Sequence, residues 1–152
     1  MLIHRTELPT EVRAILEADG TDPYDLGVPV AEQIDAVRIG VFTGALALYY
    51  VDPVVFMLRA RTPHVGDLHI SLRPGGDVFG IIRAARKFLK WAPVGTSYHK
   101  LEARTPNAAL AAVCMRCGAH LEGIRRESAL VDGVFVDEYE MGYILRRDSV
   151  AH

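Results

Sequence analysis

Two side chains in the sequence are suited to proton transfer, His69 and Cys114. His69 lies in the segment Asp67–Leu72, in which polar and apolar residues alternate, so it falls on the polar face of a predicted strand. An imidazole changes its protonation near neutral pH and could act there as a general base. The alternative interpretation is a strand-surface or hydrogen-bonded histidine that takes no part in chemistry.

Cys114 opens the arrangement Cys-x-x-Cys-x-x-His, with Cys117 and His120. A thiol can donate a proton, although its ordinary pKa of about 8.5 makes it an unusual acid, and a buried inert cysteine is the alternative. A zinc site needs a fourth ligand and the sequence has no second pair, so we expect no metal. Cysteines three residues apart on a helix are poorly placed for a disulfide, which predicts two free thiols in a reducing compartment.

A third chemistry, anion binding, is suggested by the loop Arg73–Asp77 (Arg-Pro-Gly-Gly-Asp) and the helix predicted from Val78 to Trp91. Free backbone N–H groups and the helix dipole attract phosphate at a helix N-terminus. Asp77 is a favoured N-cap, and its carboxylate could bind the amides that a phosphate would use. Arg73 and Arg83 could supply compensating positive charge.

These side chains have to be positioned by one domain, because 152 residues fit a single domain with its own core. We divide it into a helical and loop segment, residues 1–33, and a core of sheet and helices, residues 34–145. The net charge of −2 gives no general attraction to nucleic acid. No apolar run near the N-terminus has signal-peptide length, and the most apolar stretch, residues 37–60, is interrupted by Gly, Asp, Pro and Arg. We therefore expect a cytoplasmic protein without a membrane span.

The order of predicted elements defines the fold class. A short helix is predicted over residues 10–18 with Thr10 as its N-cap, followed over 21–33 by a loop with room for one helical turn. Strands are predicted over residues 37–42, 45–51, 54–60, 67–72, 100–104, 120–130 and 134–145, and helices over 78–91 and 107–117. This order predicts an α/β (α+β) domain with a mixed, mostly antiparallel sheet and flanking helices.

The helix predicted over residues 78–91 has two faces. Its apolar stripe consists of Phe79, Ile82, Ala85 and Leu89. Its basic residues lie mostly on the other side, at Arg83, Arg86, Lys87 and Lys90. Because the whole chain is slightly acidic, a solvated helix face is the better interpretation than a nucleic-acid surface.

The last third of the chain carries an ordered series of short motifs. The segment Lys100–Asn107 is followed by a helix, by Cys117-Gly118-Ala119, by Leu121-Glu122-Gly123 and by Arg125-Arg126. In this order the motifs resemble the second half of the GNAT N-acetyltransferases, and most closely the branch that acetylates ribosomal-protein N-termini. The resemblance covers roughly residues 35–145. Ala119 departs from it, because the family usually has Phe there.

The resemblance implies a binding site for acetyl-CoA. In the family the fourth and fifth strands splay apart and admit the pantetheine, so His69–Leu72 and Leu101–Arg104 would line such a gap. It also places Asn107 near the coenzyme arm, although Asn107 could simply cap the helix that follows it. Many members carry Tyr as the general acid where Cys114 stands here.

The coenzyme loop departs from the family pattern. Aligned on Leu72-Arg73-Pro74, Asp77 stands at the position of an Arg or Gln, Gly80 at the first Gly, and Ile82 at a small residue. Only Gly80 matches, and both departures oppose pyrophosphate binding, by charge and by bulk. The expected cofactor-binding residues are Leu72, Arg73, Asp77, Val78, Phe79, Gly80, Ile82 and Asn107.

Two functions follow from this mixture. The first is an acyltransferase that uses acetyl-CoA to acylate an amine or a protein N-terminus, with His69 or a water as the base. The second is a non-catalytic GNAT-fold structural or assembly protein, similar to those of tailed bacteriophages, which binds no cofactor and associates with itself or with other virion proteins. The run Leu48-Tyr49-Tyr50 is a candidate partner surface, or else a row of buried strand residues.

Overall fold

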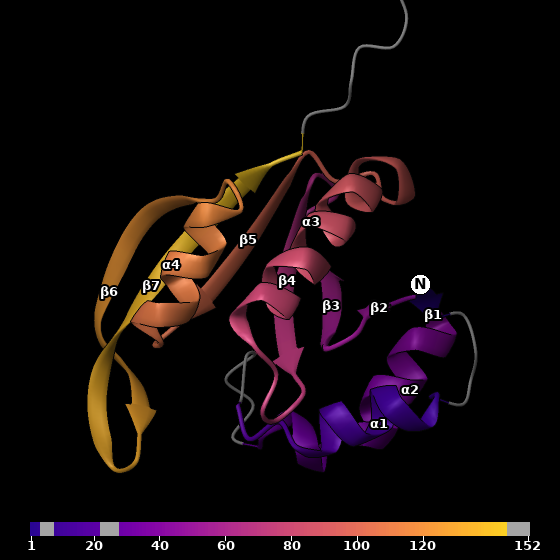
Figure 1. Cartoon of the computed structure of the whole chain (residues 1–152), viewed down its shortest axis with the longest axis horizontal. Helices are drawn as coiled ribbons and strands as arrows, with labels where there is room; N and C mark the ends of the chain where they lie inside the picture. Colours follow the sequence, from indigo (N-terminus) through magenta and orange to yellow (C-terminus); the bar gives the residue numbers. More distant parts are fainter. Residues whose placement is uncertain (4–7, 22–27, 146–152) are drawn as a thin grey trace, which may run out of the picture.

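A single mixed sheet organises the computed structural model, which describes residues 1–3, 8–21 and 28–145. Within these residues seven strands lie in the order β1-β2-β3-β4-β5-β7-β6 (Figure 1). Only β4 and β5 run parallel, and every other neighbouring pair is antiparallel. The strands are β1 (Leu2–Ile3), β2 (Leu46–Val51), β3 (Val54–Ala60), β4 (Val65–Leu72), β5 (Lys100–Thr105), β6 (His120–Val131) and β7 (Val134–Ile144). The predicted class, a mixed and mostly antiparallel sheet with flanking helices, is confirmed.

Helices cover both faces of this sheet. They are α1 (Thr10–Glu17), the 3-10 turn η1 (Val30–Glu32), α2 (Ile34–Thr43), α3 (Val78–Gly95) and α4 (Ala108–Arg116). Helices α1 and α2 share one core with β2 and β3, through side chains such as Ile15 and Met57. Helix α3 forms a second core on the opposite face, where α4 also lies (Figure 1). No helix in the described parts of the chain is long and apolar enough to cross a membrane.

Helix α2 corrects the strand predicted over residues 37–42. Alternation would have buried Val37, Ile39 and Val41 together, but a helix buries Val37 and packs Val41 against the same core, while Ile39 is 57% exposed. Gly40 lets the helix approach Leu46 closely, because an added Cβ would lie 2.7 Å from that side chain. Gly44 ends the helix with a φ of 81°, a conformation that suits glycine.

The N-terminal segment differs from expectation in details. Thr10 is the first residue of α1 and not its cap, since Pro9 precedes the helix and no side chain caps it. The predicted loop contains the short turn η1, while residues 22–27 of that loop lie outside the described residues. Strand β1 has no counterpart among the predicted strands, and at two residues it is too short for a periodic signal.

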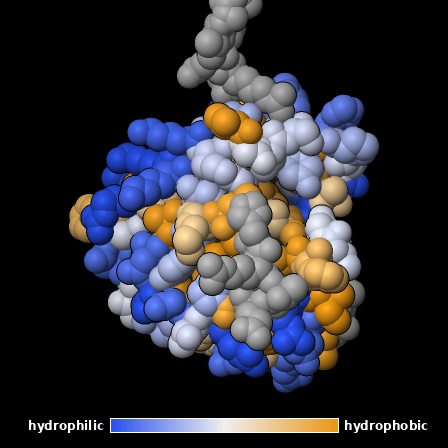
Figure 2. All heavy atoms as spheres, turned by 90° about the vertical axis from the view of Figure 1, so that its right-hand side faces the viewer, coloured by the Kyte–Doolittle hydropathy of each residue, from blue (hydrophilic) through white to orange (hydrophobic). Residues whose placement is uncertain are grey.

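Aromatic rings fill the core beneath α3. Phe56 and Phe88 stack with their centroids 4.2 Å apart, and Tyr49 stacks on Trp91 at 4.4 Å. Leu48 is fully buried on the other face. The run Leu48-Tyr49-Tyr50 is therefore strand packing, and its interpretation as a partner surface was wrong. Figure 2 shows the side of the molecule at the right of Figure 1, where hydrophobic side chains gather in the middle and hydrophilic ones at the rim.

The apolar stripe of α3 is rotated from the predicted one. Phe79 is 74% exposed, whereas Ala84 and Phe88 are buried, and the basic residues opposite them are exposed as expected.

We predict that Phe88→Ala lowers the free energy of unfolding by about 3–5 kcal/mol, because it removes a stacked ring and leaves a cavity. Phe79→Ala, the matched control on the same helix, should change it by less than about 0.5 kcal/mol. Urea unfolding measures both, and equal losses would contradict the orientation of α3.

Candidate functional site

The ladder between β4 and β5 is short. It joins Val65 to Lys100, Gly66 to Leu101 and Asp67 to Glu102, and then stops. Beyond these pairs β4 continues along β3 and β5 continues along β7, so the two strands diverge (Figure 1). We call the space between residues 68–72 and 103–105 the gap. Strand edges that face it lack a neighbouring strand, and unpaired backbone groups of this kind seek a partner.

An apolar groove covers the gap on the side of α3 and α4. Leu68, Ile70 and Ala103 form its floor. Its walls are formed by Ile81, Ala85 and Leu89 of α3 and by Leu110, Val113, Cys114 and Cys117 of α4. Its volume is about 60 Å³, and its lining is almost entirely apolar. A narrow apolar groove of this shape suits an unbranched chain of atoms better than a charged group.

A larger cavity passes through the gap and is called here the through-cavity. It measures about 630 Å³, and Cys114 of α4 lines it from the helical face of the sheet. His69 and Arg104 line it from the opposite face. The end of α1 and the β6–β7 hairpin complete its walls, through Gly20, Thr21, Ser128–Asp132 and Phe135. The through-cavity therefore connects the two candidate proton-transfer residues that the sequence indicated.

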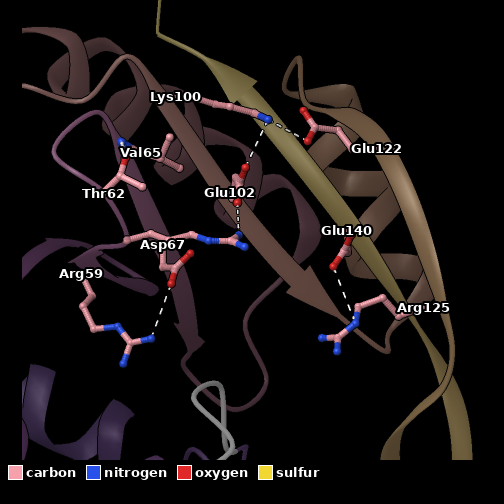
Figure 3. Close-up of polar contacts among 10 residues, drawn as sticks. Arg59, Thr62, Val65, Asp67, Lys100, Glu102, Glu122, Arg125 and Glu140 are labelled. Carbon is pink, nitrogen blue, oxygen red and sulfur yellow. Dashed lines mark hydrogen bonds and ion pairs between the residues drawn. The ribbon is translucent and has the colours of Figure 1, made fainter.

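The face opposite the helices carries a third space, the charged cavity, of about 220 Å³. Glu102 lies at its centre and pairs with Arg61 and, at 3.2 Å, with Lys100 (Figure 3). Lys100 also bonds Glu122 at 2.7 Å, and this hydrogen bond raises the pKa of its ammonium. Further pairs join Arg59 to Asp67 at 3.5 Å, and Arg125 to Glu138 at 3.7 Å and to Glu140 at 3.8 Å. The lining itself is rich in carboxylates, and Lys100, Arg59 and Arg125 pair with them from outside it.

His69 binds a carboxylate that the sequence did not single out. Its Nε2 lies 2.7 Å from Asp19, and only 12% of the His69 side chain and 7% of the Asp19 side chain are exposed. Ser71 donates to the same carboxylate at 2.5 Å, as does the Thr21 hydroxyl. Asp19 and His69 are 50 residues apart in the sequence, so no local pattern could have joined them. In the sequence Asp19 lies directly after the helix predicted over residues 10–18.

These hydrogen bonds determine the charge of Asp19. Burial by itself raises the pKa of the carboxyl, but the hydrogen bonds from His69, Ser71 and Thr21 and the charge of His69 outweigh it. The pKa of Asp19 falls to about 2, so the group is ionised throughout the neutral range. The buried charge is tolerated because every donor around it is oriented toward it.

Cys114 is placed where an acid could act but not a nucleophile. Burial, and then the neighbouring Cys117, raises the pKa of its thiol to about 11. The group is therefore protonated at neutral pH, which makes it a poor nucleophile and a weak acid. Both cysteines are free thiols. Among the described residues no group of three or more His, Cys, Asp or Glu is arranged to hold a metal.

The loop before α3 uses its polar groups internally. The Asp77 carboxylate accepts a hydrogen bond of 2.5 Å from the Gly80 amide and caps the helix, as predicted. Arg73 is bound to Asp52 at 2.5 Å and to the Tyr50 hydroxyl at 3.0 Å. An added Cβ at Gly80 would lie 3.3 Å from the Asp77 carboxylate, so glycine leaves room for the cap.

The other residues expected to hold the cofactor occupy different environments. Val78 and Phe79 are exposed at the start of α3, and Leu72 ends β4 beside the loop. Ile82 is buried and lines none of the three cavities, whereas its neighbour Ile81 lines the apolar groove. The added bulk at position 82 therefore points away from the groove.

Asn107 caps α4, as the alternative interpretation predicted. Its Oδ1 accepts a hydrogen bond of 3.1 Å from the backbone amide of Leu110, and the backbone amide of Asn107 donates to the Thr105 hydroxyl at 3.0 Å. These bonds fix the corner between β5 and α4, directly beside the gap. A coenzyme contact by Asn107 stays a prediction.

With this geometry in hand, comparison with solved structures identifies the fold. The chain superposes on the spermidine N-acetyltransferase of Vibrio cholerae in complex with CoA and spermine, with a TM-score of 0.66 and 15% identity over 95% of both chains. A GNAT superfamily phosphinothricin acetyltransferase from Sinorhizobium meliloti, in complex with AcCoA, gives 0.69 and 15% over 100% of this chain and 91% of that one. The ribosomal-protein-S5-alanine acetyltransferase of Vibrio fischeri gives 0.61 and 16% over 80% and 73%.

At these identities the similarity establishes the fold, which is that of the GNAT acetyltransferases. No protein-family model matches the sequence, and no curated protein matches it. The activity of this chain therefore has to be argued from its own residues.

Acid stability tests the charge state of Asp19. A carboxylate with a lowered pKa stabilises the fold above its unfolded pKa of about 4 and loses this contribution as the pH falls toward 2. We predict that Asp19→Asn lowers the free energy of unfolding by about 2 kcal/mol at pH 7, and that the difference shrinks below pH 4. Asp35→Asn, at a side chain that is 83% exposed, is the matched control. A difference that stays constant down to pH 3 in urea titrations would contradict the assignment.

Proposed function

We propose that this protein transfers an acyl group from an acyl-CoA thioester to an amine in the gap between β4 and β5. The observation that carries the proposal is the through-cavity, which brings Cys114 and His69 to one space from opposite faces of the sheet. The similar acetyltransferases that were solved with CoA or AcCoA support this choice of donor. A primary amine or a protein N-terminus is the acceptor class.

The residues around the gap fit one part of the donor better than another. The apolar groove and the unpaired strand edges suit the pantetheine arm, which is a slender chain with amide groups. The loop before α3 fits the pyrophosphate poorly, because Asp77 brings a negative charge and already occupies the Gly80 amide. Only the exposed start of α3, at Val78 and Phe79, is left for an anion. We therefore expect weak coenzyme binding.

Three kinds of protein group would share the chemistry: the imidazole of His69, the thiol of Cys114 and backbone N–H groups at the gap. The donor supplies an activated acyl carbon when it is bound. The imidazole of His69 accepts the proton that the attacking amine loses, and the departing sulfur takes a proton from water or from the Cys114 thiol, whose raised pKa makes it a weak acid. Backbone N–H groups on the free strand edges can hydrogen-bond the carbonyl oxygen while negative charge develops there.

The charged cavity limits the acceptor. Its carboxylates are already neutralised by arginine and lysine partners within 4.0 Å, among them Asp67, Glu102 and Glu140. A polycation would have to compete with these partners. An acceptor with a single amine, such as a protein N-terminus, would displace fewer of these pairs than a polycation.

The non-catalytic alternative rests on one observation, the capping of α3 by Asp77 in place of a phosphate. It predicts that neither acetyl-CoA nor CoA binds. Calorimetric titration with both compounds separates the two functions, because micromolar binding sustains the acyltransferase and a null result at millimolar ligand leaves the assembly role.

Blocking the gap tests where the donor binds. Ala103→Phe fills the floor of the apolar groove, so we predict that it weakens CoA binding by more than about tenfold, or ~1.4 kcal/mol. Ala112→Phe makes the same change on the exposed side of α4, outside the three cavities, and should leave the affinity unchanged. Equal affinities in calorimetry would place the donor elsewhere.

Neutralising the cap tests the loop. Asp77→Asn keeps a favoured N-cap and removes the charge, so CoA binding should tighten roughly fivefold, or about 1 kcal/mol, with little change in thermal stability. Acetylpantetheine lacks the pyrophosphate, and its affinity should not change. A variant that binds CoA no better than the wild type would show that Asp77 does not repel the donor.

A further inference from the structure

The Asp19 carboxylate, which lies outside the predicted site, is held in place by several hydrogen bonds. Its Oδ1 accepts hydrogen bonds from the Thr21 amide at 2.9 Å and the Thr21 hydroxyl at 2.5 Å. Its Oδ2 accepts from Ser71 at 2.5 Å and contacts His69 at 2.7 Å. Ser71 is only 1% exposed, so this set of bonds is closed to solvent on the side of β4. Four bonds from two elements fix one carboxylate in one orientation.

This arrangement determines which nitrogen of His69 carries the proton. An ionised carboxylate has lone pairs only, so the Nε2 atom that faces Asp19 must be the donor. In the neutral ring the lone pair is then on Nδ1. Because Nε2 is bound to Asp19, Nδ1 is the nitrogen that remains for another molecule.

His69 occupies the boundary where such a molecule would lie. It lines both the charged cavity and the through-cavity, next to the end of the short β4–β5 ladder. The other charged side chains that line these two cavities are Arg61, Asp67, Glu102, Arg104, Glu122, Asp132, Glu138 and Glu140. Asp67 pairs with Arg59, and Glu138 accepts from Ser128 at 3.0 Å. Asp19 is the carboxylate bonded to the ring.

We propose that Asp19 is the positioning residue of His69, which holds the ring in its Nε2–H form and presents Nδ1 to the acceptor amine. The catalytic part of this inference rests on the proposed acyl transfer, whereas the tautomer does not. During transfer the amine nitrogen bonds to the acyl carbon, the carbon–sulfur bond breaks, and Nδ1 takes the proton of the amine. The imidazolium so formed faces Asp19, and the sulfur takes a proton from Cys114 or from water.

Nitrogen NMR of the full chain tests the tautomer directly. The ring nitrogens of His69 should show the Nε2–H form in the wild type, and Asp19→Asn should shift the ring toward a mixture of tautomers. Asp67→Asn removes a carboxylate charge from the charged cavity that His69 lines, without removing a bond to the ring, and it should leave the wild-type tautomer. Ser71→Ala keeps the Asp19 carboxylate but removes one of its hydrogen bonds, and it provides a second variant if Asp19→Asn fails to fold. A wild-type ring protonated on Nδ1 would overturn the inference. So would a tautomer that stays unchanged in both Asp19→Asn and Ser71→Ala.

Kinetics then separates positioning from function. With acetyl-CoA and a peptide N-terminus, Asp19→Asn should lower kcat by roughly 10²–10³ with little change in KM, as expected for a group that acts through another. An active wild type with an undiminished variant would overturn the positioning role and leave the proposed function standing. The expected tautomers in a wild type that acylates nothing would instead overturn the proposed function and the catalytic use of the ring.

Discussion

The divergence of β4 from β5 is the constraint on which the candidate site depends. Seven residue pairs hold β4 to β3 and six hold β5 to β7, but only three join the two strands to each other. The sheet is therefore two halves connected by a short parallel ladder. Because α3 follows β4 and α4 follows β5, both helices begin at the open end of the gap. The backbone groups exposed there and the groove above them are consequences of this one junction.

Strand geometry gives the two sides of the gap different chemistry. Side chains alternate along β4, so Leu68 and Ile70 face α3 while His69 and Ser71 face the end of α1. One strand thus supplies the floor of an apolar groove and, on its opposite face, the imidazole that we propose as the base. Cys114 completes the apolar side with a thiol that burial keeps protonated. The proposed base and the thiol therefore face one cavity from opposite sides of the sheet.

The sequence predicted the parts of this site that local patterns encode. Alternation in residues 67–72 placed His69 correctly, and residue type alone identified Asp77 and Asn107 as helix caps. Residues 37–42 misled the prediction because a short run rich in Val, Ile and Phe fits a strand or a buried helix equally well, and packing against β2 and β3 decides between them. Asp19 was missed for another reason. Its turn with Thr21 looks local, and its contact with His69 spans 50 residues.

An altered coenzyme loop and an intact gap are compatible, because the loop would affect KM whereas groups at the gap would affect kcat. The loop would contact the donor far from its reacting carbon, so its contribution is the same before and during reaction, and its loss raises KM without lowering kcat. His69, Asp19 and Cys114 lie at the gap, and they can act on groups whose charge changes as the reaction proceeds. The cap formed by Asp77 is therefore an argument for weak binding of the nucleotide portion. It leaves the chemistry to be decided by the buried imidazole and carboxylate beside β4.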